Sequence, residues 1–149
     1  MRAASFARPA VGGCAVLLAL AGAGCSALLF ADEEERVIAT ISHYGDGVKA
    51  EIPDVATRGV AFDVTVTSYG GGCVLEGDTE VEVQGSTAVV TPYDVELRPR
   101  NGACTDDLRF YRHAARVRFD TPGQATVTVR GVRKPEGDVV TVQKTVTVQ

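Results

Sequence analysis

Apolar and polar residues alternate through most of this chain from residue 36 onward, and this alternation restricts the possible folds more than any other feature. In one segment, Val64 and Val66 alternate with Asp63, Thr65 and Thr67. Successive side chains of a strand point to opposite faces, so such a row predicts one buried and one solvated face. The apolar rows are Val60, Phe62, Val64 and Val66; Val81 and Val83; Ala125, Val127 and Val129; and Val140, Val142, Val146 and Val148. Lys144 interrupts the last row, which indicates a bulge or an edge position there.

Turn residues separate these rows, and helical periodicity is not found at convincing length. Gly, Pro, Asn and Asp supply the backbone angles that tight reversals need, and the turns are predicted at 45–47, 53–54, 70–72, 77–78, 85–86, 101–102, 122–123 and 135–138. We expect strands near 36–42, 47–52, 59–68, 78–84, 87–93, 108–119, 124–133 and 138–148. Seven or eight short strands in about 115 residues predict an all-β fold, an antiparallel two-sheet sandwich.

The N-terminal segment has the pattern of an export signal. Arg2 and Arg8 precede an apolar stretch from Val11 to Ala31, and small residues lead up to Cys25. A basic start, an apolar middle and small residues at a cleavage point are typical of proteins that leave the cytoplasm. We therefore expect a signal or anchor helix at the N-terminus, and a domain that works outside the cytoplasm.

Three modes of attachment fit this segment. The sequence from Gly22 to Cys25 resembles the lipobox of bacterial lipoproteins, in which the cysteine is lipidated and becomes the mature N-terminus; this implies a signal peptide at 1–24 and a lipid anchor on Cys25. Val11 to Ala31 is also about long enough to span a membrane as an uncleaved helix. Cleavage after Ala23 or Ala27 would instead release a secreted protein. The lipobox is the preferred interpretation, and Ser26 after the cysteine suits an outer membrane where the cell has one.

Cysteine usage agrees with export. Cys14 lies in the apolar leader and Cys25 is the lipidation candidate, which leaves Cys73 and Cys104 as a pair. An even remainder in an exported protein predicts a disulfide. Neither cysteine belongs to a Cys-x-x-Cys motif, and neither histidine has ligand spacing to them, so we expect no metal and no cofactor.

The balance of charged residues limits the kinds of partner that the domain can bind. Of 15 Lys and Arg residues two lie in the leader, so 13 remain in the exported part against all 19 acidic residues. An acidic balance argues against nucleic acid as a partner. The consecutive carboxylates from Asp32 to Glu35 predict a hydrated tether over residues 25–35, before a domain at 36–149.

The segment from Arg116 to Gly131 resembles the late-strand hairpin of bacterial immunoglobulin-like modules, in which a strand ends at Pro-Gly and an alternating Val/Thr strand follows. The whole chain is similar to small bacterial lipoproteins of no established activity that carry this module. The resemblance implies an immunoglobulin-like β-sandwich. The chain contains no tryptophan, and the Cys73–Cys104 pair is expected at strand ends or in loops, unlike the inter-sheet bridge of antibody domains.

The expected disulfide would clamp two loops at one end of the sandwich, where such domains usually carry their ligands. Aromatic and arginine side chains occur near it and form a candidate surface for protein or glycan contact: Tyr69, Tyr93, Arg98, Arg100, Tyr111 and Arg112. The alternative is that these side chains only finish the core and the solvated strand faces. His113 shares a strand face with Val117 and Phe119 and is expected to point inward, satisfied by a backbone carbonyl.

No nucleophile elbow, zinc motif or phosphate loop is present. The sequence therefore favours a non-enzymatic, membrane-anchored lipoprotein of the cell envelope that binds a protein or glycan. Two alternatives stay open. One is a structural envelope lipoprotein without a discrete ligand, and the other is a small hydrolase that uses His113 with a serine such as Ser42, Ser68 or Ser86.

Overall fold

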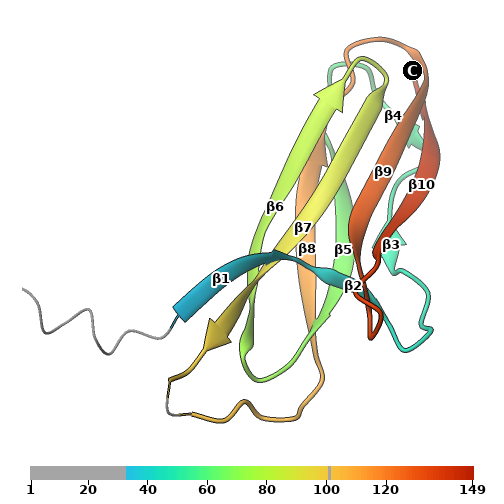
Figure 1. Ribbon diagram of the computed structural model, residues 1–149. Coiled ribbons are helices and arrows are strands. Elements are labelled where there is room, and N and C mark those ends of the chain that lie inside the picture. Colours follow the sequence, from blue (N-terminus) through green and yellow to red (C-terminus); the bar gives the residue numbers. More distant parts are fainter. Residues whose placement is uncertain (1–32, 101) are drawn as a thin grey trace, which may run out of the picture. The chain divides into compact units, whose positions relative to one another are not determined.

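A computed structural model describes residues 33–100 and 102–149 of the chain, and these residues form ten strands without a helix (Figure 1). The strands are β1 (Glu33–Ile38), β2 (Thr40–His43), β3 (Ala50–Glu51), β4 (Val55–Ala56), β5 (Phe62–Gly70), β6 (Val74–Gln84), β7 (Thr87–Arg98), β8 (Arg109–Val117), β9 (Gly123–Lys134) and β10 (Val139–Val148). The predicted all-β class is confirmed. Most strands lie where the alternation places them, although the expected strand at 47–52 is reduced to two residues.

The strands form two sheets. In the larger sheet β1, β7, β9, β10 and β4 follow one another, with β6 paired to β7 and β2 paired to β9. The smaller sheet has the order β3-β5-β8. The long strands β6 and β7 form a hairpin that reverses at Gly85, whose φ of +61° suits the two-residue turn between Gln84 and Thr87. The β6–β7 turn therefore lies at one end of the fold, and the start of β6 lies at the other end (Figure 1).

One hydrophobic core joins both sheets. The smaller sheet contributes Val64, Val66, Ala115 and Val117, and the larger sheet contributes Ala88, Val90, Val127, Val129, Val146 and Val148, together with Ile41 and Phe119. Six of them, Val64, Val66, Val127, Val129, Val146 and Val148, are positions of the predicted apolar rows, so these rows identified the core face of their strands correctly. Val60 and Val83 of the predicted rows are exposed instead. Val60 precedes β5, and its backbone N–H donates to the Thr57 carbonyl. Val83 lies near the end of β6.

Three parts of the topology differ from the sequence prediction. The sheets are not purely antiparallel, because β7 and β2 both pair with β9 in parallel and β4 pairs with β10 in parallel. The segment from Arg116 to Gly131 is not a hairpin, because β8 pairs with β5 in one sheet whereas β9 lies in the other. The chain crosses between the sheets there, and it buries Phe119 on the way.

The third difference is at Gly77 and Asp78, where a turn was expected. β6 continues through these residues with a shift of register between Glu76 and Thr79. A Cβ on Gly77 would lie 2.5 Å from the Tyr93 carbonyl oxygen, so the glycine lets the two backbones approach at a bulge.

Lys144 occupies an edge, as expected, and β10 pairs with β9 there without a shift of register. β4 covers the other side of β10 only at Thr147 and Val148. The Lys144 ammonium donates to the Ile52 carbonyl at 2.6 Å and lies 2.8 Å from the Asp54 carboxylate. A lysine on the core-facing side of an edge strand is a known obstacle to pairing with another chain.

The predicted leader, the lipidation site Cys25 and most of the acidic tether lie outside the described residues. Glu33, Glu34 and Glu35 belong to β1, where they pair with Arg98, Leu97 and Glu96 of β7. Strand β1 thus includes three residues of the predicted tether, before the expected domain start at residue 36. Within residues 33–149 without 101, no helix has the length and apolar character needed to cross a membrane.

Candidate functional site

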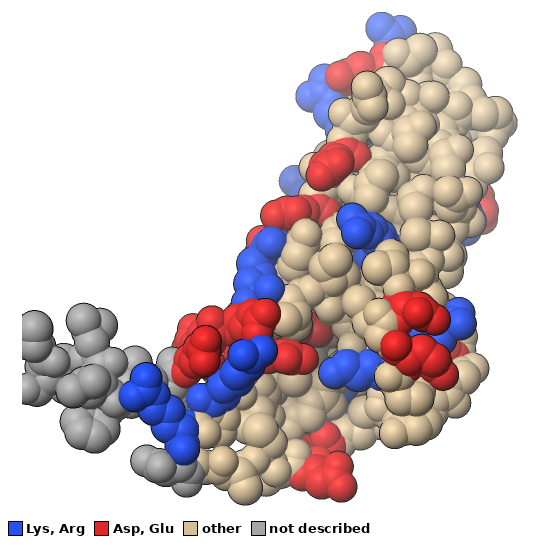
Figure 2. Space-filling model, in the orientation of Figure 1, with Lys and Arg blue, Asp and Glu red and all other residues tan. Residues whose placement is uncertain are grey.

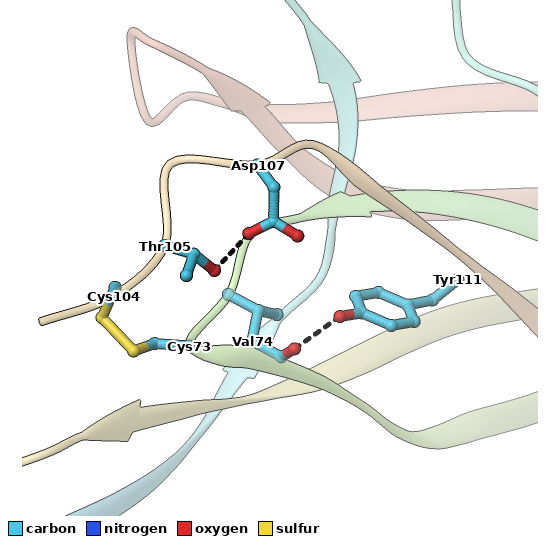
Figure 3. Close-up of a disulfide and its surroundings, with 6 residues drawn as sticks. All are labelled: Cys73, Val74, Cys104, Thr105, Asp107 and Tyr111. Carbon is cyan, nitrogen blue, oxygen red and sulfur yellow. Dashed lines mark hydrogen bonds between the residues drawn. A yellow bond between two sulfur atoms is a disulfide. The ribbon is translucent and has the colours of Figure 1, made fainter.

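The predicted disulfide between Cys73 and Cys104 is formed, and it closes one end of the fold (Figure 3). Cys73 lies directly before β6, and Cys104 lies in the long connection between β7 and β8. The Cys73 carbonyl accepts a bond from the Leu97 N–H, and the Gly72 N–H donates to the Thr105 carbonyl. Gly72 is needed for this approach, because a Cβ there would lie 1.7 Å from the Thr105 hydroxyl oxygen. The disulfide therefore ties the connecting loop to the turn at 70–72.

Side chains of the same loop fix its shape. The Thr105 hydroxyl donates to Asp107 Oδ1 at 2.5 Å, and Arg109 Nε donates to Asp107 Oδ2 at 2.6 Å. The hydrogen bond from Thr105, followed by Arg109, lowers the pKa of the Asp107 carboxyl below its ordinary value. On the adjoining strand, the Tyr111 hydroxyl donates to the Val74 carbonyl at 2.5 Å (Figure 3). These bonds hold the loop through side chains that are largely at the surface.

A cavity of about 380 Å³ lies at this clamped end. Its wall comes from five parts of the chain that are distant in sequence: β1 and β2 with the residues after them, the end of β5 with the start of β6, the second half of β7, the loop before β8, and the end of β9. The apolar part consists of Val37, Ile38, Val74 and Leu108, and the ionisable part consists of His43, Asp94, Glu96, Asp106, Asp107 and Lys134. Tyr44 and Tyr69 add aromatic surface. The volume falls in the range of small-ligand sites, roughly 300–1,000 Å³.

Asp94 connects the cavity to a buried polar cluster between the sheets, which we define as Ser68, Thr79, Asp94 and His113. Asp94 Oδ1 lies 3.1 Å from His113 Nε2 and accepts a bond from the Ser68 hydroxyl at 3.3 Å. Ser68 Oγ and His113 Nε2 are 2.9 Å apart, and Thr79 Oγ1 lies 3.5 Å from His113 Nδ1. The His113 side chain is 0% exposed and that of Asp94 is 3% exposed.

The cluster corrects one expectation about His113. The ring does point inward, but its partners are side chains of the cluster and not a backbone carbonyl. We assign a proton to Nε2, because the carboxylate facing it can only accept. The Thr79 hydroxyl can donate to Nδ1 or accept from it.

The geometry of the cluster also differs from a hydrolytic triad. In a triad the imidazole uses one nitrogen for the serine and the other for the carboxylate. Here the same nitrogen, Nε2, faces both Ser68 and Asp94, and Ser68 itself donates to the carboxylate. Ser68 is 0% exposed. A proton relay from serine through histidine to aspartate is therefore not arranged in this structure.

The candidate contact residues from the sequence lie in different places. Tyr69 lines the cavity, where its ring stacks on His43 at 5.6 Å and meets Phe110 edge-on at 5.4 Å. Tyr111 is half-buried near the disulfide. Tyr93 is on the outer face of the larger sheet, beneath the guanidinium of Arg36 at 3.3 Å.

The three arginines of that set are exposed. Arg98 pairs with Glu35 at the end of β7. Arg112 pairs with Glu51 at 3.1 Å on the outer face of the smaller sheet. Arg100 lies in the loop after β7. The structure thus places only Tyr69 in the wall of the cavity.

Charges over the rest of the visible surface are mixed. Figure 2 shows lysine and arginine side chains beside aspartate and glutamate, without a large area of one sign on the face displayed. Arg36 is an example, since it lies 2.8 Å from Asp78 and 2.7 Å from Glu80. Its guanidinium donates to Asp78 and lowers the pKa of that carboxyl.

Asp94, Thr79 and His43 are not among the site residues predicted from the sequence. A signal for Asp94 was present, because the alternation Ala88, Val90, Pro92 continues to position 94 on the inward face. An acidic residue at an inward position predicts a buried partner. His43 is half-buried and stacks on Tyr69.

Within the described ranges, no group of three or more His, Cys, Asp or Glu side chains is arranged to hold a metal ion. Comparisons with protein-family models, curated proteins and solved structures found no match for this chain. The site must therefore be interpreted from its own chemistry.

Proposed function

We propose that this protein is a non-enzymatic lipoprotein, anchored through Cys25 outside the cytoplasm, whose immunoglobulin-like β-sandwich binds a protein or glycan partner at the cell envelope. The observation that carries the proposal is the cavity at the disulfide-clamped end. Binding sites on rigid scaffolds concentrate in loops that the scaffold holds in place, and here a covalent bond fixes one of the loops that form the wall.

The disulfide also supports the proposal that the domain works outside the cytoplasm. Such bonds persist in oxidising spaces and are rare in the bacterial cytoplasm. This agrees with the export pattern before Cys25. The shared use of His113 Nε2 and the burial of Ser68 favour binding over hydrolysis as the role of this end.

A site-specific photocrosslinking experiment in intact cells tests the binding proposal. Tyr44 lines the cavity and is 74% exposed, so a photoreactive amino acid at this position is expected to yield an envelope adduct. Val83 is the matched control, because it is 47% exposed but lies near the opposite end of β6. Adducts from both positions alike, or from neither, would contradict recognition at the clamped end and favour the structural lipoprotein.

The anchor needs its own measurement. Mass spectrometry of the mature N-terminus is expected to find a diacylglyceryl group on Cys25. A start at a later small residue would indicate secretion, and an intact Met1 would indicate an uncleaved anchor.

A further inference from the structure

The cavity at the clamped end carries an excess of carboxylates, and this excess defines the kind of group that it can bind. Its wall contains Asp94, Glu96, Asp106 and Asp107 but a single ammonium, that of Lys134. Lys134 lies 3.7 Å from Glu96, and Asp107 is neutralised by Arg109. Within the described part of the chain, Asp106 makes no ion pair, and Asp94 contacts the His113 ring and the Ser68 hydroxyl in the buried polar cluster. A cationic ligand would balance the two remaining carboxylates.

A second observation at the same cavity points to a missing hydrogen-bond partner. Tyr69 is 4% exposed and lines the cavity, yet its buried hydroxyl has no partner among residues 33–100 and 102–149. Buried polar groups are nearly always paired, and an unpaired one calls for an explanation. A ligand N–H beside this hydroxyl would supply the bond.

The remaining wall suits a chain of methylene groups. Val37, Ile38, Val74 and Leu108 are apolar, and long cationic side chains bury their stems on such surface while the charged end reaches a polar partner. The aromatic rings add to this preference, since a cation is attracted to the face of a tyrosine ring. Lys49 of the chain itself already places its ammonium 5.6 Å from the centre of the Tyr69 ring.

We propose that this cavity binds the side chain of a lysine presented by a partner protein, with the alkyl stem against the apolar wall and the ammonium held by Asp94, Asp106 and the Tyr69 hydroxyl. Asp94 strengthens the attraction because a largely buried carboxylate acts through a low dielectric. The inference rests on the proposed function and narrows it to a protein partner with an exposed lysine.

Calorimetric titration of the full chain in detergent micelles tests the proposal with Nα-acetyl-lysine methylamide as the probe. Binding is expected to weaken at least about tenfold when the probe carries an additional Nε-acetyl group, because charge-assisted hydrogen bonds are lost. The loss should be similar for Asp106→Asn, and the Glu82→Gln control, on β6 and outside the cavity wall, should bind like the wild type. Equal binding of the two probes would overturn the proposal, as would an unchanged affinity of Asp106→Asn.

Tyr69→Phe separates binding from folding. Removal of an unpartnered buried hydroxyl should leave the melting temperature unchanged or raise it, while affinity for the lysine probe falls. If Tyr69→Phe binds the probe as well as the wild type does, the hydroxyl has no role in recognition and the proposed geometry is wrong.

The source of the ammonium is tested with 1,5-diaminopentane. If this free diamine binds more tightly than the lysine amide, the proposal that a partner protein supplies the ammonium is wrong. The outcomes also distinguish the two proposals: adducts at position 44 without lysine binding would refute this inference alone, whereas lysine binding without any envelope adduct would refute the proposed function.

Discussion

The buried pair of Asp94 and His113 allows a quantitative test of how the clamped end is stabilised. The two side chains are 3% and 0% exposed and lie 3.1 Å apart. Removal of one member of such a buried pair leaves the other without its partner, which typically costs about 3–5 kcal/mol. We therefore expect Asp94→Leu and His113→Leu each to destabilise the fold by about this amount.

The double substitution should cost less than the sum of the two single ones, because both single variants already lose the same interaction. Independent sites would add to about 6–10 kcal/mol, whereas the shared contact predicts a coupling energy of about 2–3 kcal/mol. Urea unfolding followed by circular dichroism at neutral pH measures all four proteins. Because losses of this size approach the whole stability of a small domain, about 5–15 kcal/mol, Asp94→Asn and His113→Gln form a second, milder cycle. Additivity within about 0.5 kcal/mol in both cycles would refute the pairing as the source of stability.

Three further predictions address the clamp and the core. Replacement of Cys73 and Cys104 by serine removes a cross-link between residues 31 positions apart. The free energy of unfolding should therefore fall by about 3.5–4 kcal/mol and the melting temperature by roughly 15 °C. A change of less than a few degrees in calorimetry would contradict this expectation. Gly131→Ala would place a Cβ 2.5 Å from Ile41 Cγ1 in the core and should lower the free energy of unfolding by about 1–3 kcal/mol in the same urea assay. Gly47→Ala is the control and should be nearly neutral, because a Cβ there has nothing within 4 Å. Equal losses of stability in the two variants would count against close packing at Gly131. The pKa of Asp107 is lowered in the folded state, so its ionised carboxylate stabilises the fold above the ordinary aspartate pKa of about 3.9, and this stabilisation is lost as pH falls through the folded value. The difference in melting temperature between the wild type and Asp107→Asn should therefore become smaller on acidification. A difference that stays constant with pH would exclude this linkage.

The sequence predicted the fold well wherever local rules decide the outcome. Alternation placed Val64, Val66, Val127 and Val129 in the core because the period of a strand is fixed by its backbone. The Cys73–Cys104 pair followed from the few cysteines that remain outside the predicted leader.

Pairing between distant strands could not be predicted in the same way. The parallel contact of β7 with β9 joins Ala88 to Val127, and nothing in either segment specifies the other. Gly77 shows a second limit, because glycine followed by aspartate is compatible with a turn and with a bulge. The neighbouring strand decided between them: the carbonyl of Tyr93 approaches Gly77 too closely for a side chain.

The candidate site was the least predictable part. Its wall joins five segments that only the folded topology brings together, and these are represented by Ile38, Tyr69, Asp94, Leu108 and Lys134. The sequence indicated the clamped end through its cysteines, and it named Tyr69. It did not indicate that the arginines of the same region, such as Arg112, would face elsewhere.

The distribution of polar groups within the core explains why the disulfide is at this end. Toward the other end the sheets pack through valines such as Val90 and Val129, which need no specific partners. At the clamped end the same interior space holds Asp94, His113 and an unpartnered Tyr69 hydroxyl, and polar groups in these positions contribute less to folding than apolar ones would. Sites that must recognise a ligand commonly reduce stability in this way. A cross-link that constrains the unfolded chain offsets this loss of stability without filling the cavity, so the Cys73–Cys104 bond is compatible with polar groups in the interior at this end.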